Sequence, residues 1–143
     1  MGKKRIVKKG GEGEGAAGRA SSSRSSRRKM ESGTVFVEAT YNNTKVSLAD
    51  MVGNVVAWSS SGSLGFAGAK KGTPFAAAKV GELIGDKAVQ MGVKEVAVVV
   101  AGVGSGRESS IRAIATKGIH INSIKDTTPI PHNGPRPPRP RRV

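Results

Sequence analysis

The sequence of 143 residues contains no cysteine. Disulfide bonds, cysteine-ligated zinc sites and thiol chemistry are therefore excluded. Aromatic residues are scarce, at one Trp, one Tyr and three Phe, which disfavours binding of single strands by stacked bases. We expect Trp58 and Phe66 to anchor the core or a loop instead. No apolar run approaches the roughly 20 residues of a membrane-spanning helix, and no amphipathic basic helix indicates a membrane surface.

Acidic residues are also few, ten against 24 Lys and Arg, so the formal net charge is +14. The excess lies at the ends of the chain. Residues 1–29 hold ten basic and two acidic side chains. Residues 30–134 hold ten basic and eight acidic side chains, and residues 135–143 hold four basic and no acidic ones. Cationic ends on a nearly neutral middle bind polyanions by releasing counterions. Nucleic acid is the expected partner, with no membrane, no small-molecule substrate, no cofactor and no metal.

The composition divides the chain into three parts. Residues 1–32 are rich in Lys, Arg, Gly and Ser, and we expect a disordered basic arm because so little apolar surface can be buried. Residues 33–128 are expected to form one α/β domain, and residues 129–143 an extended tail. The N-terminus lacks the apolar stretch of a secretory signal, although its Arg and Ser content leaves a mitochondrial transit peptide as an alternative. We expect a cytoplasmic protein.

Three short strands are predicted first, at 34–40, 45–50 and 55–60, with turns between them that favour an antiparallel meander. Val35 and Val37 are expected to face the core. A helix then opens at Thr73 and Pro74 and ends at Gly92. The apolar run 95–101 is typical of a parallel strand covered on both faces.

A second helix is predicted from about Glu108 to Lys117, with Ile111, Ile114 and Ala115 inward, and a last strand at 119–124. The predicted order is βββαβαβ, a mixed sheet with helices as right-handed crossovers.

Two glycine-rich loops are the candidate binding sites. Ligands of such sheets gather where parallel strands end, and AGVGSGRESS (101–110) lies at such an end. Its glycines are expected to let backbone N–H groups approach an anion, with Ser105 as a donor and Arg107 as a cation. Tight-turn sterics would also explain these glycines. The loop 59–73, without predicted regular structure, offers serines and a lysine pair for phosphate and ribose oxygens.

The last eighteen residues, DTTPIPHNGPRPPRPRRV, contain six prolines and four arginines. Proline excludes helix and central strand, so an extended form is expected. Guanidinium groups on a stiff extended segment suit a partner with many phosphates along a groove. A charged tail without a binding role is the alternative.

Four stretches resemble the eleventh protein of the ribosomal small subunit, a family universal among cellular organisms. They are YNNT (41–44), residues 53–77, GSGRESSIRA (104–113) and residues 126–143. The likeness covers about residues 33–143, and the PIPHNG-x-RPP ending is highly specific. The resemblance implies a ribonuclease H-like arrangement. It also implies binding of 16S-type rRNA on the platform, near the messenger and tRNA exit sites and beside other platform proteins.

Residue patterns and resemblance together predict one set of rRNA contacts, which includes loop, helix and tail positions. They are Asn42, Asn43, Ser60, Ser61, Lys70, Lys71, Gly104, Ser105, Gly106, Arg107, Arg112, His132, Asn133, Arg136, Arg139, Arg141 and Arg142. For Asn42 and Asn43, Asx-turn formation is an equally good explanation.

Two other functions compete. A ribonuclease H-like sheet is able to carry acids that chelate two metals for phosphodiester hydrolysis, but the acids of this sequence are scattered, so we expect no enzyme. A non-specific basic nucleic-acid chaperone is the second alternative.

Overall fold

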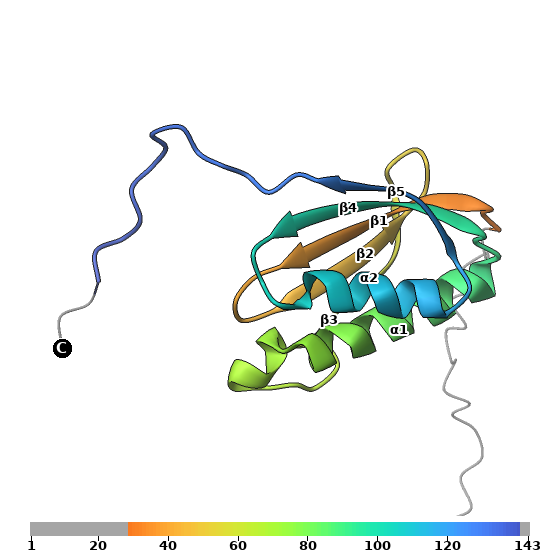
Figure 1. Cartoon of the computed structure of the whole chain (residues 1–143), viewed down its shortest axis with the longest axis horizontal. Helices are drawn as coiled ribbons and strands as arrows, with labels where there is room; N and C mark the ends of the chain where they lie inside the picture. The colour runs from red at the N-terminus through yellow and green to blue at the C-terminus, as the bar shows by residue number, and fades with distance from the viewer. Residues whose placement is uncertain (1–28, 141–143) are drawn as a thin grey trace, which may run out of the picture.

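The computed structural model describes residues 29–140. The predicted disorder of residues 1–28, and the predicted contacts of Arg141 and Arg142, lie outside the described residues. These residues form five strands, two α-helices and one short 3₁₀ helix, arranged as one layer of sheet and one of helices (Figure 1). In chain order these are β1 (Ser32–Ala39), β2 (Thr44–Ala49), β3 (Val55–Ser60), η1 (Gly68–Gly72), α1 (Pro74–Met91), β4 (Glu95–Gly102), α2 (Gly106–Thr116) and β5 (His120–Asp126).

The sheet has the strand order β3-β2-β1-β4-β5. β1 pairs antiparallel with β2, and β2 with β3, whereas β4 runs parallel to both β1 and β5. The predicted βββαβαβ order and the mixed sheet are therefore confirmed. The short helix η1 was not predicted, because its GAKKG sequence carries no apolar periodicity.

Local sequence explains why the elements form where they do. In β1, Val35 and Val37 are buried while Glu38 is exposed, as the period of two requires. The hydroxyl of Thr73 accepts from the backbone N–H of Ala76 at the start of α1. Gly92 ends that helix with φ of 84°, a left-handed conformation that glycine adopts without steric cost.

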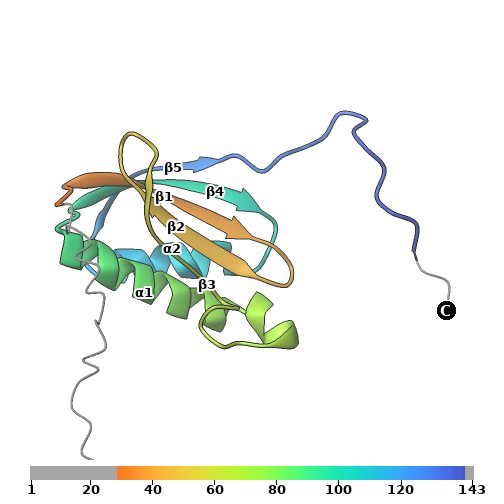
Figure 2. The same cartoon turned by 180° about the vertical axis from the view of Figure 1, so that it is seen from behind.

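Both helices lie on the same face of the sheet (Figure 2), and they contact each other through glycines of α1. A Cβ atom at Gly81 would lie 2.5 Å from the carbonyl oxygen of Ser110, so only glycine allows this approach. The core between helices and sheet is aliphatic, and its largest fully buried side chains include Leu48, Ile84 and Ile114.

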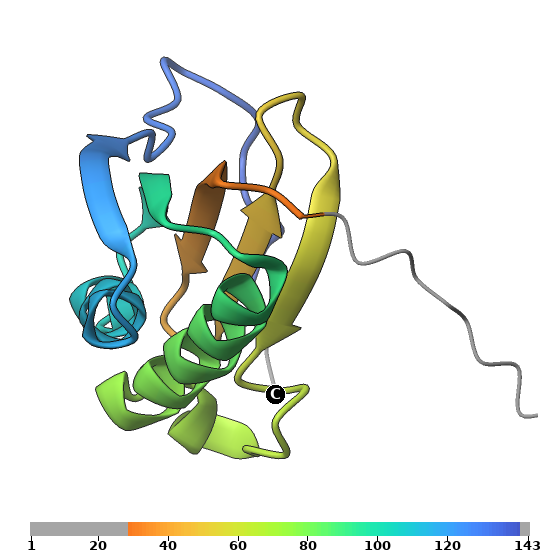
Figure 3. The ribbon, with the colours of Figure 1, turned by 90° about the vertical axis from the view of Figure 1, so that its right-hand side faces the viewer.

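The opposite face of the sheet is covered by no helix of the described chain (Figure 3). The prediction that β4 is covered on both faces is therefore wrong, and Ala97 and Val99 are only half-buried. Two further predictions fail. Ala115 is exposed, because α2 starts at Gly106 and presents Ala113 and Ile114 to the core. Trp58 is 57% exposed on the uncovered face rather than an anchor of core or loop.

Thr44 provides a test of the packing at the start of β2. Its side chain is fully buried, and its Oγ1 has no hydrogen-bond partner among residues 29–140. A buried hydroxyl without a partner carries a desolvation cost of about 1–3 kcal/mol. We expect Thr44→Val to leave the free energy of unfolding unchanged or to raise it by up to about 1 kcal/mol, measured by urea denaturation. A clear loss of stability would mean that the hydroxyl is satisfied by a buried water.

Candidate nucleic-acid interface

One end of the sheet brings together most of the predicted contacts of the domain. We call it the loop end, and define it as the end where β1, β3, β4 and β5 finish. Three connections meet there, residues 40–43, 61–73 and 103–105. Hydrogen bonds join these connections to one another. The N–H of Gly104 donates to the Ala39 carbonyl at 2.9 Å, and the Ser105 hydroxyl donates to the Gly72 carbonyl at 2.7 Å.

The glycines of the β4–α2 connection are packing residues. Gly104 and Gly106 are buried. The N–H groups of Gly102 and Gly104 are already bound, to Thr128 Oγ1 and to the Ala39 carbonyl. The backbone donors of Gly102 and Gly104 are therefore engaged within the protein, which favours the tight-turn explanation, and contact of this loop with rRNA stays a prediction. The exposed residues of the connection are Val103 and Ser105.

We expect Gly104→Ala to lower the free energy of unfolding by about 1–3 kcal/mol or more, because overpacking forces the backbone to shift. The new Cβ would lie 2.2 Å from the carbonyl oxygen of Thr40. Gly62→Ala is the matched control: its Cβ would meet nothing closer than 3.7 Å, and we expect a change within about 0.5 kcal/mol. Equal stability of the two variants in urea denaturation would contradict the packing role.

Serine hydroxyls at the loop end mainly bond to the protein itself. Ser61 is fully buried. Its Oγ accepts from the N–H of Thr44 at 3.1 Å and lies 2.7 Å from Asn43 Oδ1 and 2.8 Å from the Lys71 carbonyl. Because Ser61 has no exposed surface here, its contact with rRNA stays a prediction, and its observed bonds are internal. Its role is to join the β1–β2 turn to the lysine loop.

Two other predicted polar contacts are partly engaged. Ser60 is half-buried and exchanges hydrogen bonds with Ser63. Asn43 is half-buried, and its backbone N–H donates to the Thr40 hydroxyl, so a threonine forms this turn rather than an Asx side chain. Asn42 is exposed.

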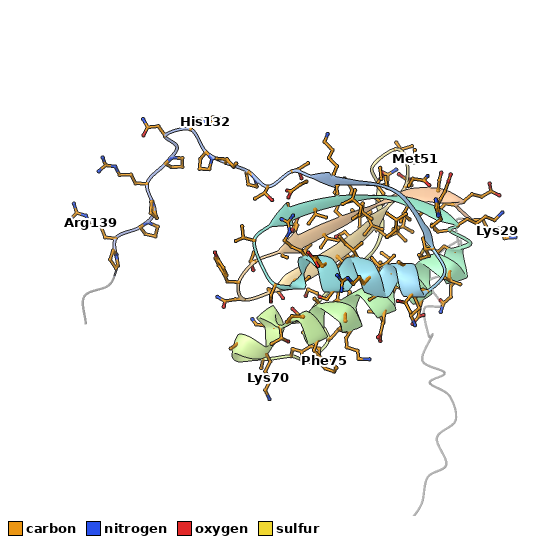
Figure 4. All side chains as sticks on the ribbon, viewed as in Figure 1. Lys29, Met51, Lys70, Phe75, His132 and Arg139 are labelled. Carbon is orange, nitrogen blue, oxygen red and sulfur yellow. The ribbon has the colours of Figure 1, made fainter. Side chains whose placement is uncertain are left out.

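Lys70 and Lys71 lie on η1 at the loop end, and Lys70 projects into solvent (Figure 4). Lys70 is exposed and Lys71 half-buried, and neither is paired with a carboxylate of residues 29–140. The Lys71 carbonyl is held by Ser61. These two ammonium groups are therefore displayed on a braced loop with their charge uncompensated.

Arg107 is a partnered side chain rather than a free cation. Its guanidinium is 2.5 Å from Asp126 Oδ2, and also donates to Thr128 Oγ1 at 3.2 Å and to the Gly102 carbonyl. Only 28% of its side chain is exposed. Asp126 therefore compensates the charge of Arg107 in the free protein, and the contact of Arg107 with rRNA stays a prediction.

Residues 126–128 form a latch at the root of the tail, and sequence reasoning missed it. Thr127 N–H donates to the Val100 carbonyl at 2.8 Å, and Thr128 bonds through its N–H and its hydroxyl to Asp126 Oδ1. The Thr128 hydroxyl, followed by the Arg107 guanidinium, holds the pKa of Asp126 far below its usual range. The available signal was an acid at the end of the last strand, followed directly by two threonines.

The tail beyond the latch contains neither helix nor strand up to Pro140 and runs away from the body (Figure 1). His132, Asn133, Arg136 and Arg139 are exposed, and Figure 4 shows His132 and Arg139 in solvent. Asn133 has φ of 56°, which bends the chain before Gly134. Arg112 lies apart from this group on α2, where it is exposed and paired with Glu108 at 3.2 Å.

The acids of the described residues do not converge. Among residues 29–140, no three His, Asp or Glu side chains are grouped so that they could hold a metal ion. Asp86, for example, is bound to Lys117 at 2.8 Å. In the same part of the chain, no helix is sufficiently long and apolar to cross a membrane.

Fold and loop end together define a small basic α/β protein with a latched cationic tail. Residues 33–142 match the family described as ribosomal protein S11. A "Small ribosomal subunit protein uS11" from Solibacter usitatus is 53% identical over 117 residues, which cover 82% of this chain and 87% of the relative. Proteins of the same name from Gloeobacter violaceus and a Synechococcus species are 52% identical over 117 residues and 51% over 120. They cover 82% and 84% of this chain, and 90% and 92% of the relatives.

The chain therefore belongs to the ribosomal protein S11 family. It is a structural ribosomal protein and not an enzyme.

Proposed function

We propose that this chain is a structural constituent of the small ribosomal subunit in the cytoplasm, and that it binds folded 16S-type rRNA through phosphate and ribose oxygens. The relatives are small-subunit proteins by name. The observation that carries the RNA contact is the placement of the uncompensated cations. Lys70 and Lys71 lie at the same end of the sheet as the root of the tail, which carries Arg136 and Arg139.

Phosphate contacts supply most of the affinity of such proteins and make it dependent on salt. Both helices also begin at the loop end, so their positive dipole ends add to the field of the lysines. On the loop end and on the tail, the half-buried Lys71 and the exposed members of the predicted set carry the contact. The exposed members are Asn42, Lys70, Ser105, His132, Asn133, Arg136 and Arg139, with Arg112 at the side of the domain.

The finer assignments rest on the family resemblance. They are the ribonuclease H-like arrangement, the platform near the messenger and tRNA exit sites, the contact with mRNA there, and the neighbouring platform proteins. The strand order β3-β2-β1-β4-β5 with crossover helices supports the first of these. The competing function, a non-specific nucleic-acid chaperone, is favoured only by the charge of the two ends.

A pair of double variants tests the loop end. We expect Lys70→Ala/Lys71→Ala to weaken binding to small-subunit rRNA and to reduce the salt slope by one to two units, at about 0.7–0.9 per lost contact. Lys87→Ala/Lys94→Ala is the control, because it removes the same charge near the opposite end of the sheet, where α1 ends and β4 begins. Equal loss in both variants would favour a general charge effect and the chaperone.

A further inference from the structure

The uncovered face of the sheet carries large apolar side chains that no described residue buries. Phe36 on β1, Ser47 on β2 and Trp58 on β3 lie opposite one another in a single cross-strand row. Trp58 is 57% exposed and Phe36 38% exposed. Aromatic side chains in contiguous exposed patches mark interaction surfaces.

A β-bulge extends this patch along the edge strand β3. The register between β2 and β3 shifts after Leu48, so that Ala49 pairs with Val55. The extra residue, Val56, changes the direction of the side chains next to it in the strand. Val55, 58% exposed, thereby shares a shallow depression of about 360 Å³ with Trp58, Lys45 and Ser47.

The β2–β3 turn adds a rigid apolar tip on the same side of the sheet. Met51 and Val52 are 73% and 86% exposed, and Figure 4 shows Met51 on the side away from the helices. The turn is fixed by Asp50, whose Oδ1 accepts from three successive backbone N–H groups, those of Val52, Gly53 and Asn54. A preorganised tip loses little conformational freedom on binding.

Charge distinguishes between the possible occupants of this face. The sheet register places four charged side chains on this face. Glu38 and Glu95 are negative and Lys45 and Lys125 are positive, so the net charge of the face is zero. A neutral apolar face does not complement a polyanion, in contrast to the loop end. A second copy would bring together two chains of net charge +14, which repel each other. The charge pattern therefore fits a different protein.

The backbone indicates the form of that partner. β3 is an edge strand of the sheet, and its sequence VVAWSS contains neither charge nor proline. Proteins usually protect free edges with such residues, whereas an unprotected edge accepts an added strand through main-chain hydrogen bonds, with side-chain pockets alongside.

We propose that β3 and its apolar neighbours Met51, Val52, Val55 and Trp58 form a docking surface for an extended strand of a second protein of the small subunit. The added strand pairs with the free edge of β3 and places apolar side chains at alternate positions over Trp58 and Val55. This inference rests on the proposed place of the chain in the subunit.

The test uses the full chain in purified small subunits, with the amount of each protein measured by mass spectrometry. We expect Val55→Lys to lower the occupancy of one other protein severalfold, while the chain itself stays in the subunit. Val89→Lys is the matched control, because Val89 is 50% exposed on α1 in the other layer, and we expect full occupancy of every protein.

A photo-crosslinker placed at position 58 gives a second readout that does not depend on the lysine variant. It should join the same protein, at a peptide of alternating apolar pattern. Crosslinks to rRNA or to another copy of the chain would overturn the proposal, as would full occupancy of every protein with Val55→Lys. Absence of the unmodified chain from small subunits would instead overturn the proposed function.

Discussion

Deletion of residues 135–143 is expected to reduce the salt slope of rRNA binding by roughly three units, at about 0.7–0.9 per lost phosphate contact. The segment carries four arginines and no acid. Arg136 and Arg139 are exposed beyond a root that the domain holds in place, so each is free to reach a phosphate. The measurement is the logarithm of the association constant against the logarithm of salt concentration, for the full chain and the truncated chain.

A variant with all four arginines replaced by lysine separates charge from geometry. It keeps every positive charge, so we expect the slope to stay within about one unit of that of the original chain. Its affinity should still fall, because an ammonium group cannot form the paired hydrogen bonds of a guanidinium. If the truncated chain has an unchanged slope, the tail does not touch phosphate.

Asp126→Asn is expected to weaken rRNA binding about three- to tenfold, although it removes a negative charge from a protein that binds a polyanion. Loss of the carboxylate releases Arg107 and Thr128, so the first residues of the tail lose their fixed position. Ordering them again on binding costs conformational entropy of about 1–2 kcal/mol for each residue fixed. Titration of a small-subunit rRNA fragment at fixed salt measures the effect. Electrostatics alone predicts the opposite sign, which makes this variant decisive for the latch.

Asp86→Asn is the matched control for Asp126→Asn. It also removes one carboxylate and releases one cation, Lys117, but the pair joins the two helices and not the tail. We expect equal or slightly tighter binding for this variant. If both variants tighten binding to the same extent, Asp126 acts only through its charge.

The latch also has a defined dependence on pH. The folded-state pKa of Asp126 is depressed, so its stabilising contribution is present above the unfolded-state pKa of about 3.9. The contribution is lost as the pH falls through the folded value. Tail orientation should therefore be the same at pH 5 as at pH 7.

The order of the elements was predictable because each one carries a local signal. Val35 and Val37 alternate with exposed residues in β1, and Thr73, Pro74 and Gly92 mark the ends of α1. No such local signal shows whether a second layer of helices covers the other face of the sheet. Apolar alternate residues such as Val99 and Trp58 look the same in a sequence whether a helix of the same chain or another molecule faces them.

The candidate site was predictable in place but only partly in role. Lys70 and Lys71 are displayed as expected, whereas Ser61 and Gly104 are used internally. Residue type alone does not distinguish a hydroxyl offered to a ligand from one that joins two loops. The Arg107–Asp126 pair joins residues nineteen positions apart, so only the folded chain reveals it.

The most direct test of the central claim is crosslinking of the full chain to RNA in native lysate, followed by sequencing of the bound fragments. Recovery of one compact region of small-subunit rRNA, with crosslinked peptides from residues 68–72 and the tail, is the predicted result. Fragments scattered over unrelated RNA and DNA would contradict it and would indicate a non-specific chaperone.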